Sequence, residues 1–376
     1  MLKVPTRIAG TDILARRGTA TPPGKETTVR TLVYGAGPLG SLYAARLHEA
    51  GVDVSLLARG RRLEDLRTHG LVLEDAVTGE RETHQVPVVD ALEPEDAYDL
   101  VLVVMRKDQS LDILPTLAKN RHAHTVLFVQ NNPAGFDEQV GWLGADRVMA
   151  GFPVMGGQRE DPVMRFQTFP LMASPIGEVD GTVTERTQRV AAHLRRMRGQ
   201  RFVIRRDMDA WLFTHVTLIV TYVGVYAADL DAGRYARTRD ARLLGVRARD
   251  EALRAQRAAG IPVSPRWFSF AFAIPEPLVV AQLRAMTGMT LFDVGVIAHA
   301  AVARGEMVQV LDEFRARVAP GGVATPTLDR VASHIEGTVP PLPDGSREEP
   351  LRWGGVAALG AAVAAATGLG LLRRRR

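Results

Sequence analysis

The sequence predicts a doubly wound α/β domain followed by an all-helical domain. Between residues 29 and 206, short β-rich runs alternate with helical stretches, which is typical of a parallel sheet with helices on both faces. From about Met208 the chain is Ala- and Arg-rich at helical spacing, with Pro and Gly at the breaks. We therefore expect a loose extension (1–28), a sheet domain (29–206), a helical domain (207–335), and a Pro-rich linker with an apolar tail (336–376).

The first strands are expected at Val29–Tyr34 and Asp53–Leu57, with a helix between them that ends near Ala50. Leu100–Met105 and Val126–Val129 are continuous apolar runs, as expected for strands buried on both faces of a sheet. Three further strands are expected to complete the same sheet: Met149–Phe152, Met164–Phe169 and Arg201–Ile204.

The second domain is predicted to consist of long helices. They are expected at Asp209–Ala228, Ala236–Ala259, Pro277–Met286 and Leu291–Val318. Pro340–Pro350 is polar and Pro-rich, and it is predicted to be a linker.

Composition excludes several classes of function. The chain has no cysteine, which rules out disulfides, thiolate metal sites and cysteine nucleophiles. Its nine histidines show no metal-ligand spacing, so no metal is expected. The net charge of +5 includes the terminal run Arg373–Arg376, and there is no basic-aromatic stripe, so no nucleic-acid partner is expected either.

A glycine-rich turn follows the first predicted strand and opens the first predicted helix. It has the pattern G-x-G-x-x-G and consists of Gly35, Ala36, Gly37, Pro38, Leu39 and Gly40. The first glycine makes the tight turn, the second lets the backbone approach a pyrophosphate, and the third lets the helix pack on the strand. The helix N-terminus then offers free N–H groups to the phosphates. The turn predicts a Rossmann-type dinucleotide site, although an empty glycine-rich turn would have the same pattern.

The end of the second strand indicates which dinucleotide is bound. A residue that hydrogen-bonds the ribose 2′-hydroxyl would be Asp or Glu, whereas this chain has Ala58-Arg59-Gly60-Arg61-Arg62 at this place. The guanidinium of Arg59 suits a 2′-phosphate, with Arg61 or Arg62 in support. We therefore expect NADP(H), the alternative being a solvated basic loop.

These motifs resemble the ketopantoate reductase (2-dehydropantoate 2-reductase) family. The resemblance rests on the glycine turn with Arg59-Gly60, on the stretch Leu100–Gln109 and on Leu127–Asn131, and it covers about residues 29–330. In the second domain it rests on the helix pattern, Arg304-Gly-Glu306 and the ending Gly322–Pro326. It implies an active site between the two domains and NADPH-dependent reduction of ketopantoate, in the pathway to pantothenate.

The resemblance also implies roles for single residues. Asn131 corresponds to an asparagine near the nicotinamide, and Glu306 to a glutamate that holds the nicotinamide-side ribose. Arg106 stands where the family has a lysine, with Lys107 beside it and Gln109 at the family's glutamine. Arg106 and Lys107 therefore become candidates for charge balance near the reaction, or else an exposed basic loop.

The family's general-acid lysine has no counterpart here. The family places it after a Trp-x motif, where this chain has Trp211-Leu212-Phe213, and the asparagines that follow are Thr217 and Thr221. The substrate-binding serine expected near Val294 also has no clear match. Because general acid catalysis contributes about 10²- to 10⁴-fold, the family's usual mechanism is not expected.

Two kinds of substitute are available. Thr214, Thr217 and Thr221 fall within about 60° on a helix, so their hydroxyls would line one face or would satisfy backbone carbonyls. His299 precedes Glu306 by seven residues and would stack on it in an unbroken helix, which makes it a candidate proton donor, although Gly305 could break that helix.

The C-terminal tail is apolar up to its last residues. Gly354–Leu372 is nineteen residues without charge, followed by Arg373–Arg376. Membrane contact, an Ala-rich packed helix and a disordered extension all fit this composition. The first 28 residues lack the apolar core of a secretory signal, so a cytoplasmic protein is expected, with membrane contact through 354–376 as an open alternative.

The function expected from these observations is NADPH-dependent reduction of a 2-oxo acid or related ketone, with a remodelled substrate face and a homodimer built on the helical domain. A non-catalytic NADP(H)-binding sensor or interaction protein of the same fold is the alternative.

Overall fold

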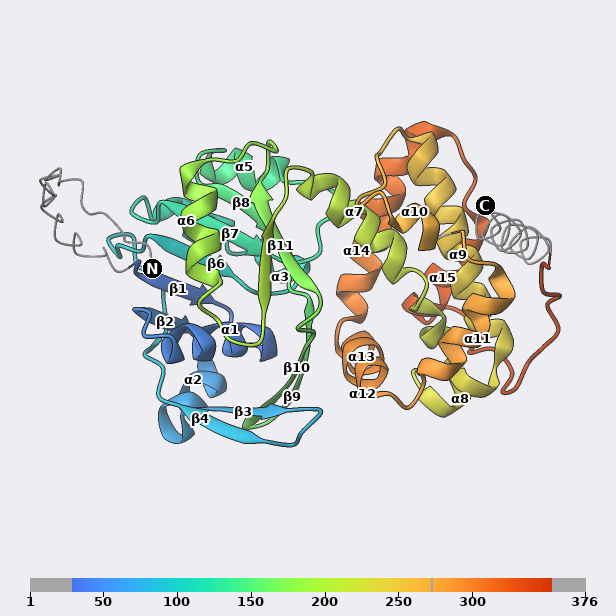
Figure 1. Cartoon of the computed structure of the whole chain (residues 1–376), viewed down its shortest axis with the longest axis horizontal. Coiled ribbons are helices and arrows are strands. Elements are labelled where there is room, and N and C mark those ends of the chain that lie inside the picture. The colour runs from blue at the N-terminus through green and yellow to red at the C-terminus, as the bar shows by residue number, and fades with distance from the viewer. Residues whose placement is uncertain (1–28, 272, 354–376) are drawn as a thin grey trace, which may run out of the picture.

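The computed structural model describes residues 29–271 and 273–353. It shows a sheet domain and a helical domain side by side (Figure 1). The predicted fold class is confirmed: a mostly parallel sheet with helices on both faces is followed by a second body made of helices. The predicted extension 1–28 and the apolar tail lie outside the described residues.

An eight-stranded sheet forms the centre of the first domain, in the order β12–β11–β8–β7–β6–β1–β2–β5. The six strands from β5 to β8 are parallel, whereas β11 is antiparallel to β8 and β12 runs parallel to β11. The bounds are β1 Thr31–Tyr34, β2 Val54–Leu57, β5 Val88–Val89, β6 Leu100–Val103, β7 Thr125–Val129, β8 Val148–Gly151, β11 Ala173–Glu178 and β12 Arg201–Ile204.

Helices cover both faces of this sheet, which explains why β1, β6 and β7 are buried throughout. Leucines of α1 and α6 share one apolar core with one face, and leucines of α4 and α5 share a second core with the other. The bounds are α1 Pro38–Glu49, α2 Gly60–His69, α3 Lys107–Ser110, α4 Leu114–Lys119, α5 Asp137–Leu143 and α6 Glu185–Leu194.

A second, four-stranded sheet has the order β4–β3–β10–β9. Its strands are β3 Leu71–Asp75, β4 Arg81–His84, β9 Met155–Glu160 and β10 Val163–Thr168. The prediction that Met164–Phe169 completes the main sheet is therefore wrong, because this strand pairs in parallel with β3, in the register Val163↔Val72. Met164 and Phe166 of this strand are buried in a core that the main sheet shares, whereas Val163 and Arg165 are only partly buried.

The second domain is helical throughout the part of it that the structure describes. The bounds are α7 Met208–Ile219, the 3₁₀ helix η1 Val223–Ala228, α8 Ala232–Arg237, α9 Arg239–Ala258, α10 Phe268–Ala271, α11 Glu276–Met286, α12 Thr290–Phe292, the π helix η2 Asp293–Ala298, α13 His299–Val302, α14 Arg304–Val318, the 3₁₀ helix η3 Ala319–Gly321 and α15 Pro326–Glu336.

The predicted helix Leu291–Val318 is wrong as a single element. It is divided by the π helix η2 and by a bend of 89° between Val302 and Arg304. Ala303 has φ −111° and ψ 24°, which is outside the helical region, so the break precedes Gly305. The bend sets α13 almost perpendicular to α14.

The segment Met208–Ala228 is long and apolar enough to cross a membrane, but 72% of its most apolar window is buried inside the protein. Phe213, Val216 and Val220 belong to the core of the helical domain. We therefore interpret α7 and η1 as the central helix of that domain.

Candidate functional site

The glycine turn lies where β1 ends, beside the end of β6. Gly35 has φ +120°, a conformation that favours glycine, and a Cβ there would lie 2.5 Å from the carbonyl oxygen of Val104. A Cβ on Gly40 would lie 1.8 Å from the oxygen of Gly35, so α1 packs against the turn itself. A Cβ on Gly37 would meet nothing within 4 Å. The turn is thus closed on its protein side and open at Gly37, where a pyrophosphate would approach.

The first turn of α1 suits an anion. Gly37 is its N-cap and provides no capping side chain, and the turn holds no acidic residue. The first N–H groups of a helix have no intrahelical partners, and the helix dipole favours negative charge there. The residues present therefore fit the pyrophosphate of a dinucleotide.

Arg59 is exposed beyond the end of β2. Its Nη2 donates to the hydroxyl of Tyr34 at 2.5 Å, and Arg61 is exposed next to it. Arg62 behaves differently, since it is buried and donates to the carbonyl of Ala36 and the hydroxyl of Ser41, both at 3.3 Å. Arg59 and Arg61 thus leave two guanidinium groups at the surface beyond β2, whereas Arg62 is buried against the glycine turn and α1.

The loop after β6 carries Arg106 and Lys107 in different environments. Arg106 is partly exposed and donates to the carbonyl of Val302 at 3.0 Å and to Asp108. Lys107 is buried; its ammonium lies 2.8 Å from the carboxylate of Glu313 and donates to Asn132. Burial lowers the pKa of Lys107, while Glu313 opposes that shift. Lys107 is therefore a buried contact between the two domains.

One face of α14 carries the polar contacts that join the domains. Glu306 accepts from Asn131 Nδ2 at 3.2 Å, and Glu313 pairs with Lys107. Arg317 donates to the carbonyl of Pro133 at 2.8 Å and pairs with Asp209. Glu306, Glu313 and Arg317 are seven and four residues apart, which places them on one side of a helix.

Unpaired polar atoms gather where β7 ends. Both amide atoms of Gln130, Oδ1 of Asn131, Nδ2 of Asn132 and Oε2 of Glu306 are buried without a hydrogen-bond partner in the protein. Buried polar groups are nearly always hydrogen-bonded, so such a cluster indicates a polar ligand or ordered water. It lies at the carboxyl ends of parallel strands, where open α/β sheets bind their ligands.

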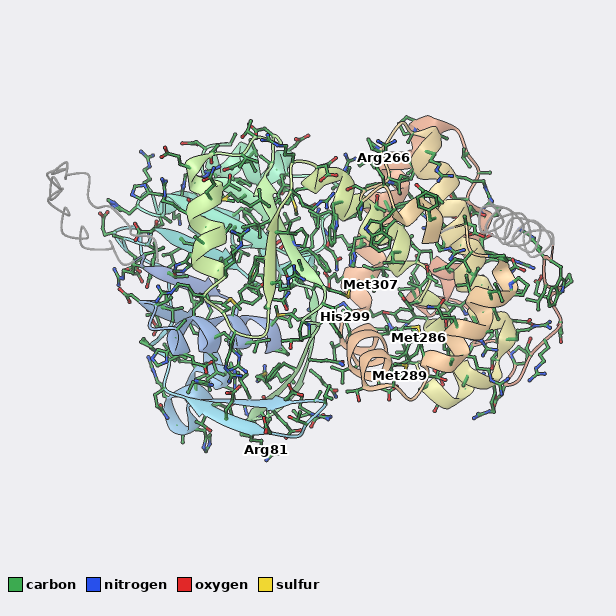
Figure 2. The ribbon with its side chains drawn as sticks, in the orientation of Figure 1. Arg81, Arg266, Met286, Met289, His299 and Met307 are labelled. Atoms are coloured by element: carbon green, nitrogen blue, oxygen red, sulfur yellow. The ribbon has the colours of Figure 1, made fainter. Side chains whose placement is uncertain are left out.

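His299 lies on α13, at the side of the helical domain that faces the sheet domain (Figure 2). Its Nε2 is 3.9 Å from Oε2 of Glu306, so the two form an ion pair when the imidazole is protonated. The bend at Ala303, rather than the predicted continuous helix, brings them together. The side chain is 43% exposed, which leaves it accessible to a substrate.

His215 of α7 faces the same region. Its ring stacks on Trp211, with centroids 5.3 Å apart, and lies 4.0 Å from the ring of Phe152. Burial, helped by the charge of His299, lowers the pKa of His215 to about 3. His215 is therefore neutral near neutral pH.

Strand β9 brings η2 close to the glycine turn. A Cβ on Gly157 would lie 2.7 Å from Cβ of Pro38, and a Cβ on Gly156 would lie 3.5 Å from Cα of Gly295. The two glycines thus let the first turn of α1 and the helix that leads into His299 pack against one strand.

Phe213 and Thr217, where the resemblance implies a lysine and an asparagine, are core residues. Phe213 is fully buried and stacks on Phe314, with centroids 4.7 Å apart, under the guanidinium of Arg317. Thr217 donates to Gln256 at 2.8 Å, and Gln256 donates to Thr214 at 2.8 Å. The hydroxyls of Thr214 and Thr217 therefore bond to the side chain of Gln256 and not, as the second interpretation predicted, to backbone carbonyls. The hydroxyl of Thr221 is buried without a hydrogen-bond partner in the described part of the chain.

Sequence reasoning did not identify Asn132, Glu313 or Arg317 as part of this region. The spacing of the charged residues along α14 was the available signal for Glu313 and Arg317. Asn132 had none, because its neighbours come from distant parts of the chain.

Residues 31–172 match the family model of ketopantoate reductase PanE/ApbA. Among curated proteins, the 2-dehydropantoate 2-reductase of Archaeoglobus fulgidus is 30% identical over 169 residues, which are 44% of this chain and 53% of the relative. That of Pyrococcus horikoshii is 26% identical over 134 residues, or 36% of this chain and 42% of the relative. The matches thus span about half the length of these relatives.

Solved structures extend the likeness of fold to both domains. A D-mandelate dehydrogenase with NADH and anilino(oxo)acetate superposes with a TM-score of 0.63 at 15% identity, covering 82% of this chain and 97% of the other. A 2-dehydropantoate 2-reductase from Geobacter metallireducens gives 0.63 at 20% identity, covering 82% and 100%. At these identities the likeness concerns the fold alone.

Proposed function

We propose that the protein is an NADPH-dependent reductase of a 2-oxo acid or related ketone, a proposal supported by the match of residues 31–172 to the ketopantoate reductase family model. Its proton donor is His299 in place of the family's lysine. The substrate face is remodelled, since Phe213 and Thr217 belong to the core of the helical domain.

The glycine turn and Arg59 hold the cofactor. Amides at the start of α1 take the pyrophosphate next to Gly37, and the exposed guanidinium of Arg59 takes the 2′-phosphate. Asn131 and Glu306, each of which has a buried oxygen without a hydrogen-bond partner at the end of β7, hold the nicotinamide end. A bound nicotinamide nucleotide supplies the hydride that reduces the carbonyl carbon.

His299 supplies the proton. As the carbonyl carbon is reduced, charge develops on its oxygen, and Nε2 of a protonated His299 donates to that oxygen. Glu306 lies 3.9 Å from the same nitrogen and keeps the imidazole directed toward the domain interface. His215 remains neutral, because its low pKa keeps the proton off its ring, and with Phe152 and Trp211 it forms an apolar wall beside His299.

The observation that carries this proposal is the line of side chains Asn131–Glu306–His299. It joins the end of a sheet strand to an exposed titratable group on the helical domain. A dinucleotide site alone would need only the sheet domain. The contacts from Asn131 through Glu306 to His299 add a proton donor, His299, which the second domain provides.

The test is NADPH consumption over a panel of 2-oxo acids, with wild type, His299→Asn, and His69→Asn as the matched control on the exposed surface of α2. We expect turnover of at least one member, a fall in kcat of about 10²- to 10⁴-fold in His299→Asn, and no change in the control. NADPH affinity measured by calorimetry should be unchanged in all three. A wild-type kcat in His299→Asn would refute the assignment of His299 as proton donor. Absence of turnover with every 2-oxo acid of the panel would refute the proposed reductase activity.

A non-catalytic NADP(H)-binding protein is the second candidate, because Phe213 and Thr217 stand where the family has its acid and an amide. This second candidate predicts tight NADPH binding with no turnover. The same panel of 2-oxo acids distinguishes it from the reductase.

Two further proposals hold with either function. The first is a homodimer formed through the helical domain, which light scattering of the purified chain tests. The second is a cytoplasmic location, with membrane contact through 354–376 as the alternative.

A further inference from the structure

The loop after β7 is connected to α14 at three consecutive residues. Asn131 donates to Glu306 at 3.2 Å, and the carbonyl of Pro133 accepts from Arg317 at 2.8 Å. Asn132, between these two residues, is connected to α14 through a lysine of the loop after β6. One helix therefore holds the loop that carries the unpaired amide atoms described above.

The lysine that connects Asn132 to α14 is Lys107. Its side chain is only 3% exposed; its Nζ lies 2.8 Å from the carboxylate of Glu313 and donates to Oδ1 of Asn132. The same carboxylate accepts from Gln309, one turn earlier on α14, at 2.9 Å. A buried ammonium that loses its carboxylate partner is costly, so this bridge favours one position of α14 against the sheet domain.

The bonds on Asn131 and Asn132 also fix the orientation of both amide groups. An ammonium only donates, so the atom that Asn132 presents to Lys107 is Oδ1, and its Nδ2 is buried without a partner in the described chain. A carboxylate only accepts, so Asn131 presents Nδ2 to Glu306 and keeps Oδ1 unpaired. Two adjacent side chains thus leave one free donor and one free acceptor, the combination that suits a carboxamide such as that of nicotinamide.

The loop after β6 contacts both helices that meet at the bend between α13 and α14. Arg106 donates to the carbonyl of Val302 at 3.0 Å, at the end of α13. Lys107, the next residue, pairs with α14. Since α13 carries His299 and α14 carries Glu306, two adjacent cations of the sheet domain hold the two helices whose side chains meet at the site.

We propose that Lys107 is a positioning residue for the nicotinamide end of the cofactor, an inference that rests on the proposed NADPH binding. Through Glu313 it fixes α14, and with it Glu306. Through Asn132 it fixes the loop that carries Asn131. The adenosine half of the cofactor is held by the glycine turn and the end of β2, which depend on other contacts. Removal of Lys107 therefore weakens binding at the nicotinamide end alone.

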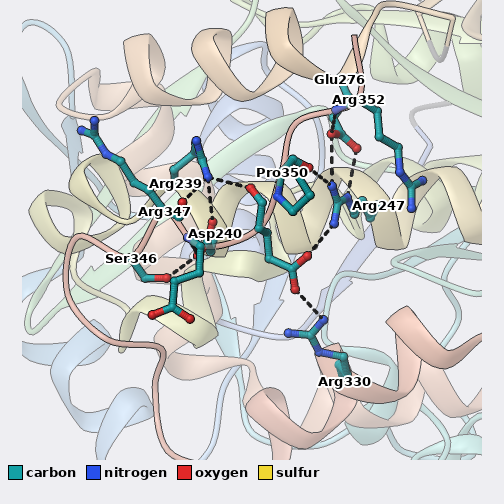
Figure 3. A network of polar contacts seen from close by, with 11 residues as sticks. Arg239, Asp240, Arg247, Glu276, Arg330, Ser346, Arg347, Pro350 and Arg352 are labelled. Carbon is teal, nitrogen blue, oxygen red and sulfur yellow. Dashed lines mark hydrogen bonds and ion pairs between the residues drawn. The ribbon is translucent and has the colours of Figure 1, made fainter. Parts of the chain in front are cut away.

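An ion-pair network elsewhere in the helical domain provides a control for lost stability. Figure 3 shows that Arg247, on α9, bonds to the carboxylates of Glu276 and Glu349, at 3.1 and 2.9 Å. Arg247 is 16% exposed and Glu276 is 6% exposed, so removal of the guanidinium leaves a buried charge unpaired, as removal of Lys107 does. Both carboxylates belong to the helical domain or to the predicted linker after it. A loss of stability can therefore be separated from a loss of position.

The experiment measures, by calorimetry, the affinity of the full chain for NADPH and for 2′,5′-ADP, which carries the 2′-phosphate and lacks the nicotinamide half. The variants are Lys107→Met, the double substitution Lys107→Met with Glu313→Gln, Arg247→Met, and Lys119→Met, which replaces an exposed lysine of α4.

We expect Kd for NADPH to rise by about tenfold in Lys107→Met and in the double variant, and to stay at the wild-type value in Arg247→Met and Lys119→Met. Kd for 2′,5′-ADP should stay at the wild-type value in all four. Thermal unfolding should show a lower Tm in Lys107→Met and in Arg247→Met, and a recovery in the double variant, because removal of both charges leaves neither unpaired.

Four results would overturn the inference. An unchanged Kd for NADPH in Lys107→Met would show that the bridge positions nothing at the nicotinamide end. An equal rise for both ligands, or wild-type NADPH affinity in the double variant, would assign the effect to lost stability. Wild type that bound 2′,5′-ADP as tightly as NADPH would leave the nicotinamide end without a contribution. None of these measurements requires turnover, so failure here is distinguishable from failure of the reductase.

Discussion

Two glycines of the phosphate turn should respond to the same added methyl group in opposite ways. Gly37 has φ −72° and ψ −177°, which any residue adopts, and a Cβ there meets no protein atom within 4 Å. Gly37→Ala should therefore cost under about 1 kcal/mol of stability, the scale of an N-cap change. The methyl group would nevertheless occupy the approach of the pyrophosphate to the helix amides. We expect Kd for NADPH to rise by about tenfold to a hundredfold, which corresponds to about 1.4 to 2.8 kcal/mol.

Gly40→Ala is the matched variant. Its Cβ would lie 1.8 Å from the backbone oxygen of Gly35, and only a shift of α1 away from β1 could relieve that contact. We expect a loss of about 3 kcal/mol or more. For a domain of this size that lowers Tm by roughly 6 to 12 °C. Calorimetry with NADPH and thermal unfolding by circular dichroism measure both quantities. Unchanged NADPH affinity in a folded Gly37→Ala, or wild-type stability in Gly40→Ala, would refute the assignment of the turn.

Two further predictions concern single side chains. Arg59→Ala should lower the preference for NADPH over NADH by about tenfold, the loss of one charged contact, while Arg61→Ala changes it less; an equal effect on both nucleotides would contradict the 2′-phosphate assignment. His193 is buried beside the hydroxyl of Thr31, at 2.9 Å, and burial lowers its pKa to about 4 from 6.5. As the pH falls, His193 is protonated in the unfolded chain before it is protonated in the folded chain. The contribution of the neutral, buried His193 to the free energy of unfolding is therefore complete above about pH 6.5 and is lost as the pH falls toward 4. Urea unfolding across this range should show a smaller pH dependence in His193→Gln than in wild type, and an identical dependence would contradict it.

The main sheet was predictable because its strands are local, apolar and separated by turn residues. Leu100–Val103 and Thr125–Val129 are buried on both faces, and only a continuous apolar run satisfies that environment. The small sheet was not predictable in the same way. Arg81–His84 has no apolar run, and β10 pairs with β3 across about ninety residues of chain, so periodicity identifies a strand there without identifying its partner.

The candidate site likewise has one part that the sequence predicts and one part that it does not. The cofactor turn is a local motif, and its residues are adjacent in the sequence. The contacts of Glu306 with Asn131 and with His299 depend on a bend at Ala303 and on the docking of two domains, and neither is encoded by spacing along the chain. A straight helix would also have stacked His299 over Glu306, so the expected pairing has a different physical cause from the predicted one.

Phe213, which stands where the resemblance implies a lysine, is best understood through its contacts with α14. Phe213 stacks on Phe314 of that helix, and Arg317 of the same helix lies over its ring, 5.1 Å from the centroid. The aromatic pair therefore fixes α14 against α7. Because α14 also carries Glu306 to Asn131, packing at position 213 positions the side chain that faces His299. A lysine at this position would place a second cation under Arg317 in a fully buried site, where an unpaired charge is costly. The proposed reductase therefore takes its proton donor from another element, and our proposal assigns that donor to His299 of α13, which the bend brings to 3.9 Å from Glu306.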